Sequence, residues 1–206
     1  MKTRFQTLFT TGAAALTCAL LATFAAPGGA SESAAPSVAA YDIDSGHSGV
    51  VFRTKHLGVA YFYGTFNDVK GSFSMDADDP SKSSIQIEIK ADSIDTNSEQ
   101  RDGHLKSPDF LAAKEFPVIK FESTKVKKKG DGMAVTGDLT LHGVTKEVTA
   151  EVELVGAGET YQGYKAGFVA DFTIDMTDFE MSYVQSNPGA LGPEVDLTVS
   201  IEGLRK

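Results

Sequence analysis

Histidine is the residue type of this sequence best suited to chemistry near neutral pH, because an imidazole can transfer a proton or bind a metal. The four histidines stand 9, 48 and 38 residues apart, at His47, His56, His104 and His142. None of these intervals matches the short spacing of zinc ligands on a helix or a knuckle. Spacing therefore predicts no metal site, and we favour structural roles in turns and at strand ends. A metal-assisted hydrolase, with histidines assembled in space, is the alternative.

Two short clusters carry the residue types of acid–base chemistry. His47 stands beside Ser48, and Arg101 and Asp102 precede His104. A nucleophilic serine needs a base within hydrogen-bond reach and donors for the developing oxyanion. No G-x-S-x-G elbow occurs in the chain. We therefore predict that the protein is not an enzyme and needs no cofactor, and that the second cluster ties a short helix to the rest of the fold.

The first 30 residues have the features of an export signal. Lys2 and Arg4 precede an uncharged stretch, residues 8–26, which is rich in Ala, Leu, Thr and Phe and ends at PGGA. This order predicts a signal peptide over residues 1–30 and a flexible leader over residues 31–40. The mature chain should then be periplasmic or secreted. An uncleaved anchor is the alternative for this segment. No other stretch is apolar for long enough to cross a bilayer, so an integral membrane protein is not expected.

Cysteine usage and charge limit the mature chain further. The single cysteine, Cys18, lies within the signal, so no disulfide and no thiolate chemistry is expected after export. Without Lys2 and Arg4, 17 of the 19 basic residues remain against 28 acidic residues, a net charge of −11. Such a chain repels nucleic acids and anionic lipid surfaces at long range, so nucleic acid is not an expected partner. The basic run KVKKK is interpreted as a solvated hairpin end.

Alternation with a period of two dominates the chain after residue 40. Ile85, Ile87 and Ile89, for example, alternate with polar residues, which is typical of an antiparallel strand with one dry face. Turn residues separate eight such runs, at about 42–55, 59–76, 84–94, 118–128, 133–142, 145–156, 164–178 and 194–204. Eight strands favour a sandwich or a closed barrel, and a barrel of this size either fills with side chains or holds one small ligand.

One segment, residues 100–117, interrupts the strand rhythm with the text QRDGHLKSPDFLAAKEFP. Ser107 followed by Pro108 suits a helix start, because a hydroxyl cap precedes proline at the first helical position. Pro117 would end such a helix. We therefore predict one short helical segment that presents apolar side chains to the sheet.

Three motifs resemble the YceI-like family of periplasmic polyisoprenoid-binding proteins. The first is the opening YDIDSGHSGVVFRTKHLGVAYFYGTF, with its His-Ser pair, its Lys-His-x-Gly and its later Gly-x-Phe. The second is RDGHLKSPDFLAAKEFPVIKFES, and the third is GDLTLHGVTKEV. They occur in the family's order, and the resemblance spans residues 41–206. Members often have a tryptophan near the start, where Tyr41 stands in this chain.

The resemblance implies an all-β fold: an extended, eight-stranded, antiparallel lipocalin-like barrel whose interior holds a polyisoprenoid or the tail of an isoprenoid quinone. Small residues such as Ala150 and Ala170 would leave room for that chain. The expected ligand-binding residues are Phe52, His56, Tyr61, Phe73, Ile89, Phe110, Phe116, Ile119, Phe121, Phe172 and Met176. His47 or His56 could contact a polar end of the ligand. A barrel filled with side chains, acting as an interaction module, is a further alternative, and a homodimer is compatible with the sequence.

Overall fold

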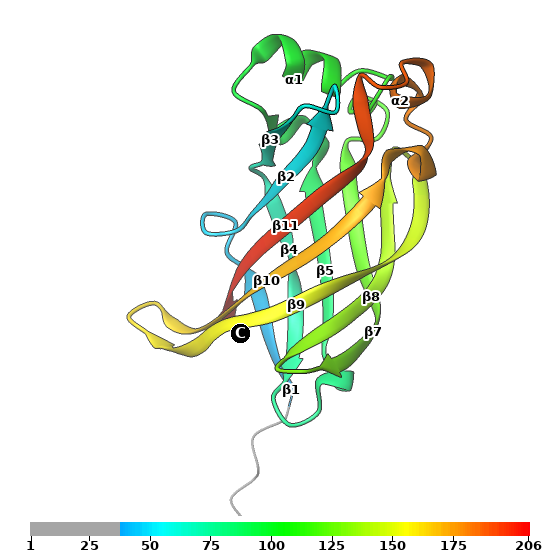
Figure 1. Cartoon of the computed structure of the whole chain (residues 1–206). Helices are drawn as coiled ribbons and strands as arrows, with labels where there is room; N and C mark the ends of the chain where they lie inside the picture. Colours follow the sequence, from blue (N-terminus) through cyan, green and yellow to red (C-terminus); the bar gives the residue numbers. More distant parts are fainter. Residues whose placement is uncertain (1–37) are drawn as a thin grey trace, which may run out of the picture. The chain divides into compact units, whose positions relative to one another are not determined.

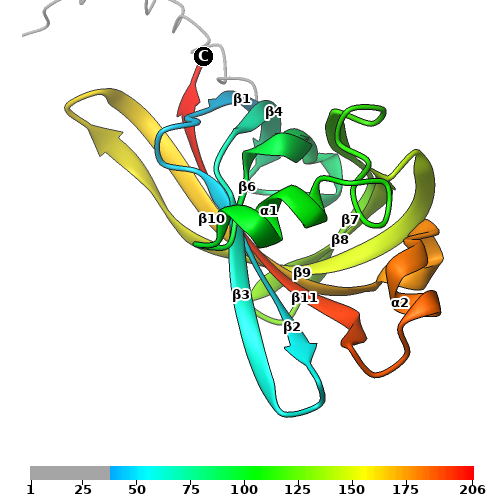
Figure 2. The same cartoon turned by 90° about the horizontal axis from the view of Figure 1, so that it is seen from above.

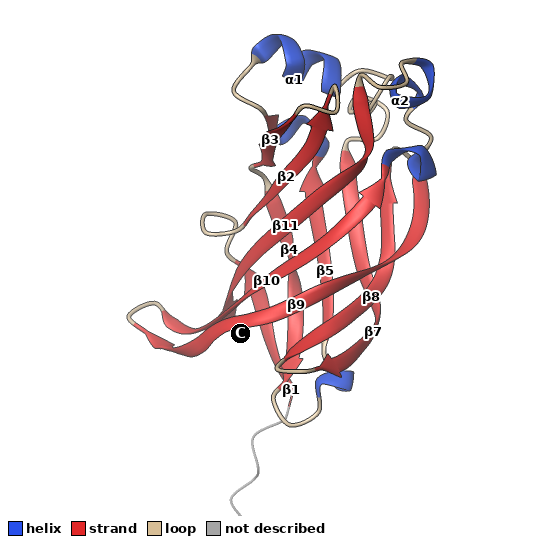
Figure 3. Ribbon diagram, in the orientation of Figure 1, coloured by secondary structure: helices blue, strands red, loops and turns tan. Residues whose placement is uncertain are grey.

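The computed structural model describes residues 38–206, which form a mostly antiparallel β-structure with short helices at its ends (Figures 1 and 3). The strands are β1 (Val38–Ile43), β2 (Gly49–His56), β3 (Ala60–Phe66), β4 (Val69–Asp76), β5 (Ser84–Lys90), β6 (Ile94–Asp95), β7 (Val118–Lys129), β8 (Gly132–Leu141), β9 (Val144–Thr160), β10 (Gly163–Asp175) and β11 (Leu191–Arg205). The helices are α1 (Glu99–Leu105) and α2 (Ser182–Ser186), with 3-10 turns η1 (Pro80–Lys82), η2 (Ala91–Ser93) and η3 (Met176–Phe179).

Eight of these strands close into a barrel. The order β1-β4-β5-β7-β8-β9-β10-β11 returns to β1, because β1 pairs with β4 on one side and with β11 on the other. Tyr41 shows the closure directly: it lies opposite Phe73 of β4 and opposite Arg205 of β11. Every pairing in this ring is antiparallel, which confirms the predicted eight-stranded antiparallel barrel. Closure leaves no free edge along the ring.

Two of the predicted strands are each divided in the structure. The run predicted over residues 42–55 divides into β1 and β2, since the Asp44 carboxylate accepts a hydrogen bond from the backbone N–H of Gly46, 3.0 Å away, and turns the chain. The run predicted over 59–76 divides into β3 and β4 at residues 67–68. As a result β11 pairs with β2 along most of its length and with β1 only at its end. The branch β2-β3-β6 therefore extends the sheet beyond the ring.

One boundary predicted from the sequence needs correction. Residues 38–40, assigned above to a flexible leader, form the first half of β1 and pair with β4. The rest of that leader and the expected signal peptide, residues 1–30, lie outside the described residues. The barrel thus begins a few residues earlier than its sequence pattern indicated.

The prediction of a helix beginning at Ser107 is wrong. The helix is α1, and its cap is Ser98, whose hydroxyl accepts from the backbone N–H of Arg101 at 3.4 Å. After Ser107 the chain makes hydrogen-bonded turns, and Ala112 has a left-handed φ of 44°, which a continuing helix excludes. The second helix, α2, was not predicted. Within residues 38–206 no helix is long and apolar enough to cross a bilayer.

Candidate ligand-binding cavity

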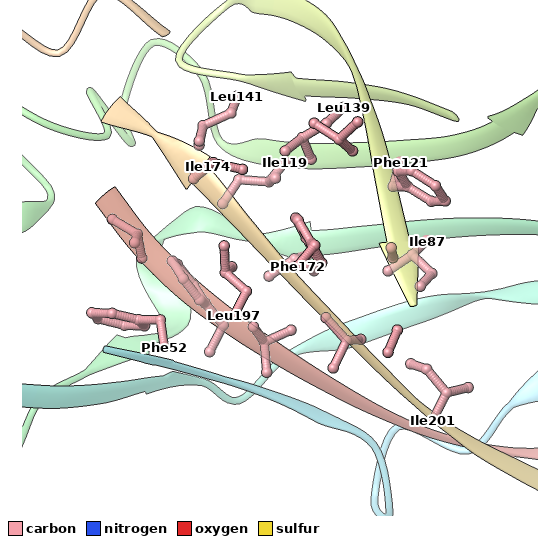
Figure 4. A pocket seen from close by; sticks show the side chains of 18 of the residues that line it. Phe52, Ile87, Ile119, Phe121, Leu139, Leu141, Phe172, Ile174, Leu197 and Ile201 are labelled. Atoms are coloured by element: carbon pink, nitrogen blue, oxygen red, sulfur yellow. The ribbon is translucent and has the colours of Figure 1, made fainter. Parts of the chain in front are cut away.

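The inward faces of the barrel strands enclose a cavity of about 180 Å³ (Figure 4). Its wall comes from all strands of the ring except β1, and from β2, β3, β6, the α1 region and the segment around η3. The labelled side chains of Figure 4 converge on one space: Phe52, Ile87, Ile119, Phe121, Leu139, Leu141, Phe172, Ile174, Leu197 and Ile201. Well-packed interiors contain few voids larger than a water molecule, so a cavity of this size is a feature of the fold.

The wall carries no charged side chain, and its few hydroxyls are already engaged. Thr54 Oγ1 lies 3.1 Å from the carbonyl oxygen of Gly192 and 3.0 Å from that of Glu194. The hydroxyls of Ser74 and Ser84 lie 2.8 Å apart, and Ser83 and these two complete the polar part of the wall. A cavity lined in this way offers a ligand contacts between apolar groups and excludes water. It could not hold a metal or stabilise a developing charge.

Adaptable side chains are concentrated in this wall. All four methionines within residues 38–206 line it: Met75, Met133, Met176 and Met181. An unbranched thioether side chain rotates to fit irregular shapes. The wall can therefore change its shape around a bound chain more easily than a wall of β-branched residues alone.

Three strand glycines lie directly under phenylalanine rings of the cavity, in the pairs Phe52–Gly64, Phe121–Gly137 and Phe73–Gly203. A Cβ built on Gly64 would lie 2.3 Å from a ring carbon of Phe52, its cross-strand partner, so no side chain fits there. Glycine weakens a strand by about 0.5–1 kcal/mol, and an aromatic ring covering it recovers part of that loss. The arrangement lets large rings lie against the wall, and it keeps the axis open.

A cap of two segments covers one end of the cavity. Phe110 and Leu111, between α1 and β7, line the wall there, and so does Met181 beside α2. Outside them, the His104 ring lies 5.1 Å from Phe110 and 5.0 Å from Tyr183. The backbone N–H of Tyr183 also donates to the carbonyl oxygen of Asp109 at 3.2 Å. These contacts join the two cap segments, which come from distant parts of the chain.

The Arg101–Asp102 pair connects α1 to the barrel and takes no part in the cavity wall. Arg101 Nε donates to Thr96 Oγ1 at 2.8 Å, and its terminal nitrogen donates to the Thr96 carbonyl at 2.6 Å. Asp102 accepts from the N–H and the hydroxyl of the same residue. Thr96 is buried and follows β6 directly. The structural role inferred for this pair from the sequence agrees with these contacts.

Comparison with known proteins decides the family. Residues 41–203 match the sequence profile of the YceI-like domain. The chain belongs to the YceI-like family. The UPF0312 protein of Photorhabdus laumondii is 44% identical over 166 residues, which are 80% of this chain and 85% of that relative. The UPF0312 protein of Pseudomonas aeruginosa is 43% identical over 166 residues, with the same two coverages.

Solved structures share this YceI-like barrel. The YceI protein of Campylobacter jejuni superimposes with a TM-score of 0.62 at 26% identity and covers 74% of this chain and 89% of its own. BcnA of Burkholderia cenocepacia gives 0.72 at 21% identity, over 78% and 99%. A polyisoprenoid binding domain from Saccharophagus degradans gives 0.61 at 13% identity, over 82% and 99%. At their low identities, the last two show the fold alone.

Eight of the eleven residues predicted to contact a ligand lie in the wall of this YceI-like cavity: Phe52, Phe73, Ile89, Phe110, Ile119, Phe121, Phe172 and Met176. Three lie elsewhere. Tyr61 points outward and is 46% exposed, because Phe62 and Phe66 are the inward residues of β3. His56 is exposed at the end of β2, and Phe116 is half-buried against the ring of His142, 5.5 Å away.

Several wall residues were missed by the sequence analysis. They include Leu191, Val195 and Leu197 of β11, and Met181 of the cap. The alternation in β11 was a usable signal, because these residues share the face of Val199 and Ile201. Met181 follows a 3-10 turn, so no strand or helix periodicity predicted that it would line the cavity.

The four histidines do not meet. His104 Nε2 lies 3.1 Å from Asp109, His142 Nδ1 lies 2.9 Å from the carbonyl oxygen of Phe179, and His56 is exposed on β2. His47 stands apart from them beside Asp44. No pair of these imidazoles therefore shares a site in the part of the chain that the structure describes.

One group of residues 38–206 has the ligand atoms of a metal site, namely Asp44, His47 and Glu202, with these atoms within 4.8 Å of one another. Lys165 Nζ already lies 3.2 Å from Asp44 Oδ2 and 2.6 Å from Glu202 Oε1. Hydrogen bonds from His47 and then Lys165 lower the pKa of Asp44 to about 2, and hydrogen bonds to Glu202 and Asp44 raise the pKa of Lys165. The ammonium of Lys165 thus pairs with both carboxylates, and the group forms an ion-pair network at the β1–β2 turn.

Proposed function

We propose that this YceI-like protein is a non-catalytic carrier that binds a long isoprenoid lipid, or an isoprenoid quinone by its tail, inside the barrel. The observation that carries the proposal is the uncharged, apolar cavity within a closed barrel. The proposal includes export, so that the mature chain works in the periplasm or outside the cell.

The direction of the cavity suits a linear ligand. Its wall runs from Ser74 and Ser84 at the β4–β5 hairpin to Phe110 and Leu111 near α1, and these elements stand at opposite ends of the barrel (Figures 1 and 3). A methyl-branched hydrocarbon needs no polar partner along its length. Its burial is favourable by roughly 25 cal/mol per Å² of apolar area removed from water, before the costs of association.

A related barrel supports the ligand class. The structurally similar domain from Saccharophagus degradans is a polyisoprenoid binding domain. Since one fold can serve several functions, this likeness supports the proposal through the shared barrel alone. The apolar wall of this chain supplies the independent support.

The residues of the cavity wall are the reason that the proposed function is non-catalytic. Acid–base, nucleophilic and electrostatic catalysis all require polar groups aimed at the reacting atoms. The hydroxyls in the wall are hydrogen-bonded to backbone groups or to one another, and the histidines lie apart. We therefore infer that the bound molecule leaves chemically unchanged.

Lipid extraction tests the proposal. The chain from residue 31 onward is expressed with an export signal, purified without detergent, extracted with organic solvent and analysed by mass spectrometry. We expect an isoprenoid in a near-stoichiometric amount. Ala150→Phe, which places a ring in the wall, should lose it, whereas Thr149→Phe on the outer face of the same strand should retain it.

Two results would count against the carrier. The first is a lack of isoprenoid both after expression and after reconstitution with a solvent-dispersed polyprenol or ubiquinone. The second is equal retention by Ala150→Phe and the parent protein, since a ligand in the cavity cannot share space with the new ring. Cell fractionation and sequencing of the mature N-terminus test the proposed export separately.

A further inference from the structure

The β2–β3 hairpin ends in an exposed apolar tip. Leu57 is 59% exposed and Val59 is 85% exposed. Behind them on the outer face, Tyr61 and Tyr63 are 46% and 56% exposed. We call Leu57, Gly58 and Val59 the hairpin tip. Single exposed apolar residues are ordinary on protein surfaces. The exposure of the hairpin tip alone therefore does not indicate a function, and the residues around it have to be considered.

The backbone conformation of the hairpin tip is unfavourable for the leucine that occupies it. Leu57 and Gly58 have left-handed φ values of 52° and 70°, and the N–H of Val59 donates to the carbonyl oxygen of His56 at 3.0 Å. A β-turn with positive φ at both central positions favours Asn-Gly. Leucine instead occupies the first position, exposed and strained, where asparagine would suit the backbone better. A local rule broken without a packing gain points to a function of the side chain.

The segments around the hairpin tip lack the acidic residues that are frequent in the rest of the chain. Residues 45–67, which include β2 and β3, contain no carboxylate, and neither do residues 181–193, although the chain has 28 acidic residues. The two segments meet at the tip, where the N–H of Leu57 donates to the carbonyl oxygen of Ala190 at 3.0 Å. Lys55 flanks the tip and lies 5.7 Å from the ring centroid of Tyr61. An apolar tip, a cation and tyrosines at the next level are the arrangement of a membrane-interface anchor.

The tip is also continuous with the cavity. Thr54 and Phe62, on the inner face of the same hairpin, line the cavity, and Leu191, which lies opposite His56, lines it too. We propose that the β2–β3 hairpin tip docks on a lipid bilayer by inserting Leu57 and Val59 among the headgroups, with Lys55 near the phosphates. The proposal rests on the carrier function, because a water-insoluble chain has to be loaded and released at a membrane.

The β9–β10 hairpin provides a matched control. Val155 and Tyr161 near its end are 71% and 97% exposed, but Glu153 and Glu159 accompany them. Figure 2 shows the two hairpins extending from the barrel in clearly different directions. If exposed apolar residues alone were sufficient, the protein would bind a bilayer through either hairpin. The proposal expects binding through the β2–β3 hairpin tip only.

The chain has no tryptophan, so a single introduced indole reports on its own position. With the chain from residue 31 onward and phosphatidylcholine vesicles containing phosphatidylglycerol, Val59→Trp should show a blue-shifted emission that brominated lipids quench. Val155→Trp should show neither change. The barrel closes within residues 38–206, so the fold tested does not depend on the expected signal peptide.

Partitioning gives the second measurement. Leu57→Asn with Val59→Ser should lower the vesicle partition coefficient about tenfold, equivalent to about 1.4 kcal/mol, and Leu57→Asn keeps a residue suited to the turn. Val155→Ser with Tyr161→Ser should change the coefficient less than about twofold. Lys55→Gln should weaken binding to vesicles with phosphatidylglycerol and leave binding to pure phosphatidylcholine unchanged.

Three results would overturn the docking proposal: no partitioning by the parent chain, equal losses from both pairs of substitutions, or a tip substitution that converts a dimer into a monomer. The last result would assign the tip to a second copy of the chain. The carrier function is judged separately, because the tip variants should still retain a solvent-dispersed isoprenoid. If the parent chain retains the isoprenoid but does not bind vesicles, docking alone is refuted. If the parent chain binds vesicles but retains no isoprenoid, the carrier function alone is refuted.

Discussion

Enlarging Ala170 tests whether the interior of the barrel is open. This residue lies on β10 between Phe168 and Phe172, and all three line the cavity. Ala170→Leu adds three carbon atoms to a wall that now has space in front of it. The cargo-free protein should become more stable, while the retention of an isoprenoid should fall. Opposite effects on stability and on binding are expected only if the new side chain occupies the ligand's space.

The magnitude follows from the cavity. Left unfilled, about 180 Å³ of void corresponds to about 4 kcal/mol of lost packing at about 24 cal/mol per Å³. Three added carbons recover about 2.4 kcal/mol at about 0.8 kcal/mol each. Strain and lost rotamer freedom remove about 1–1.5 kcal/mol. The net gain is about 1 kcal/mol, which raises the melting temperature by about 2–4 °C in a domain of this size.

The control is on the same face of the same strand. Ala166 is 1% exposed and lies in the packed core outside the cavity wall. Ala166→Leu should therefore destabilise the protein by about 1–3 kcal/mol through overpacking. Thermal and urea unfolding of delipidated protein measure both effects, and mass spectrometry measures retention. If Ala170→Leu destabilises the protein as much as Ala166→Leu does, the interior is solid at that position and the reasoning fails.

Three further variants test other parts of the structure. Thr54→Val removes a buried hydroxyl that bonds to carbonyls of β11, so the free energy of unfolding in urea should fall by about 1–2 kcal/mol; an unchanged midpoint would mean that these carbonyls have other donors. Hydrogen bonds from His47 and Lys165 hold the pKa of Asp44 at about 2, below its usual 3.8. Because the folded value is the lower one, this carboxylate stabilises the fold above about pH 4 and loses that effect as the pH falls towards 2. Asp44→Asn should flatten the acid limb of the melting temperature against pH, and a limb identical to the parent's would contradict this account. Gly64→Ala should lower the melting temperature and tilt the aromatic ring of β2 that covers it, seen as a displaced ring resonance by NMR; an undisturbed spectrum would show that the close approach is not required.

Local patterns in the sequence were enough to locate most of the strands, whereas the closed barrel was implied by the family resemblance. In β5, Ile85, Ile87 and Ile89 alternate with polar residues, and all three isoleucines line the cavity. Such alternation is reliable because successive side chains of a strand point to opposite faces whatever the strand pairs with. Most of the predicted wall residues were found in this way or through the family motifs.

Where a local pattern was compatible with two structures, the sequence alone did not predict which of them forms. The run Tyr61-Phe62-Tyr63 has an aromatic residue on both faces, and the parity that turns Phe62 inward comes from the pairing of Arg53 with Tyr63 and of Thr54 with Phe62. Likewise Ser107 resembles a helix cap as well as Ser98 does. The contacts of Thr96 with Arg101 and Asp102 place the helix at the earlier site.

The sequence by itself determined that this chain consists of antiparallel strands with one apolar face, because period-two alternation and turn residues are local properties. The eight-stranded barrel was implied by the family resemblance. Only the tertiary structure decided that the apolar faces enclose a cavity. That outcome depends on β1 bridging β4 and β11, and on glycines that allow rings such as Phe52 to lie against the wall. It also brought two segments without carboxylates together at the hairpin tip. The closure of β1 on β11 and the meeting of Leu57 with Ala190 both join residues more than a hundred positions apart, and no short window of sequence contains such contacts.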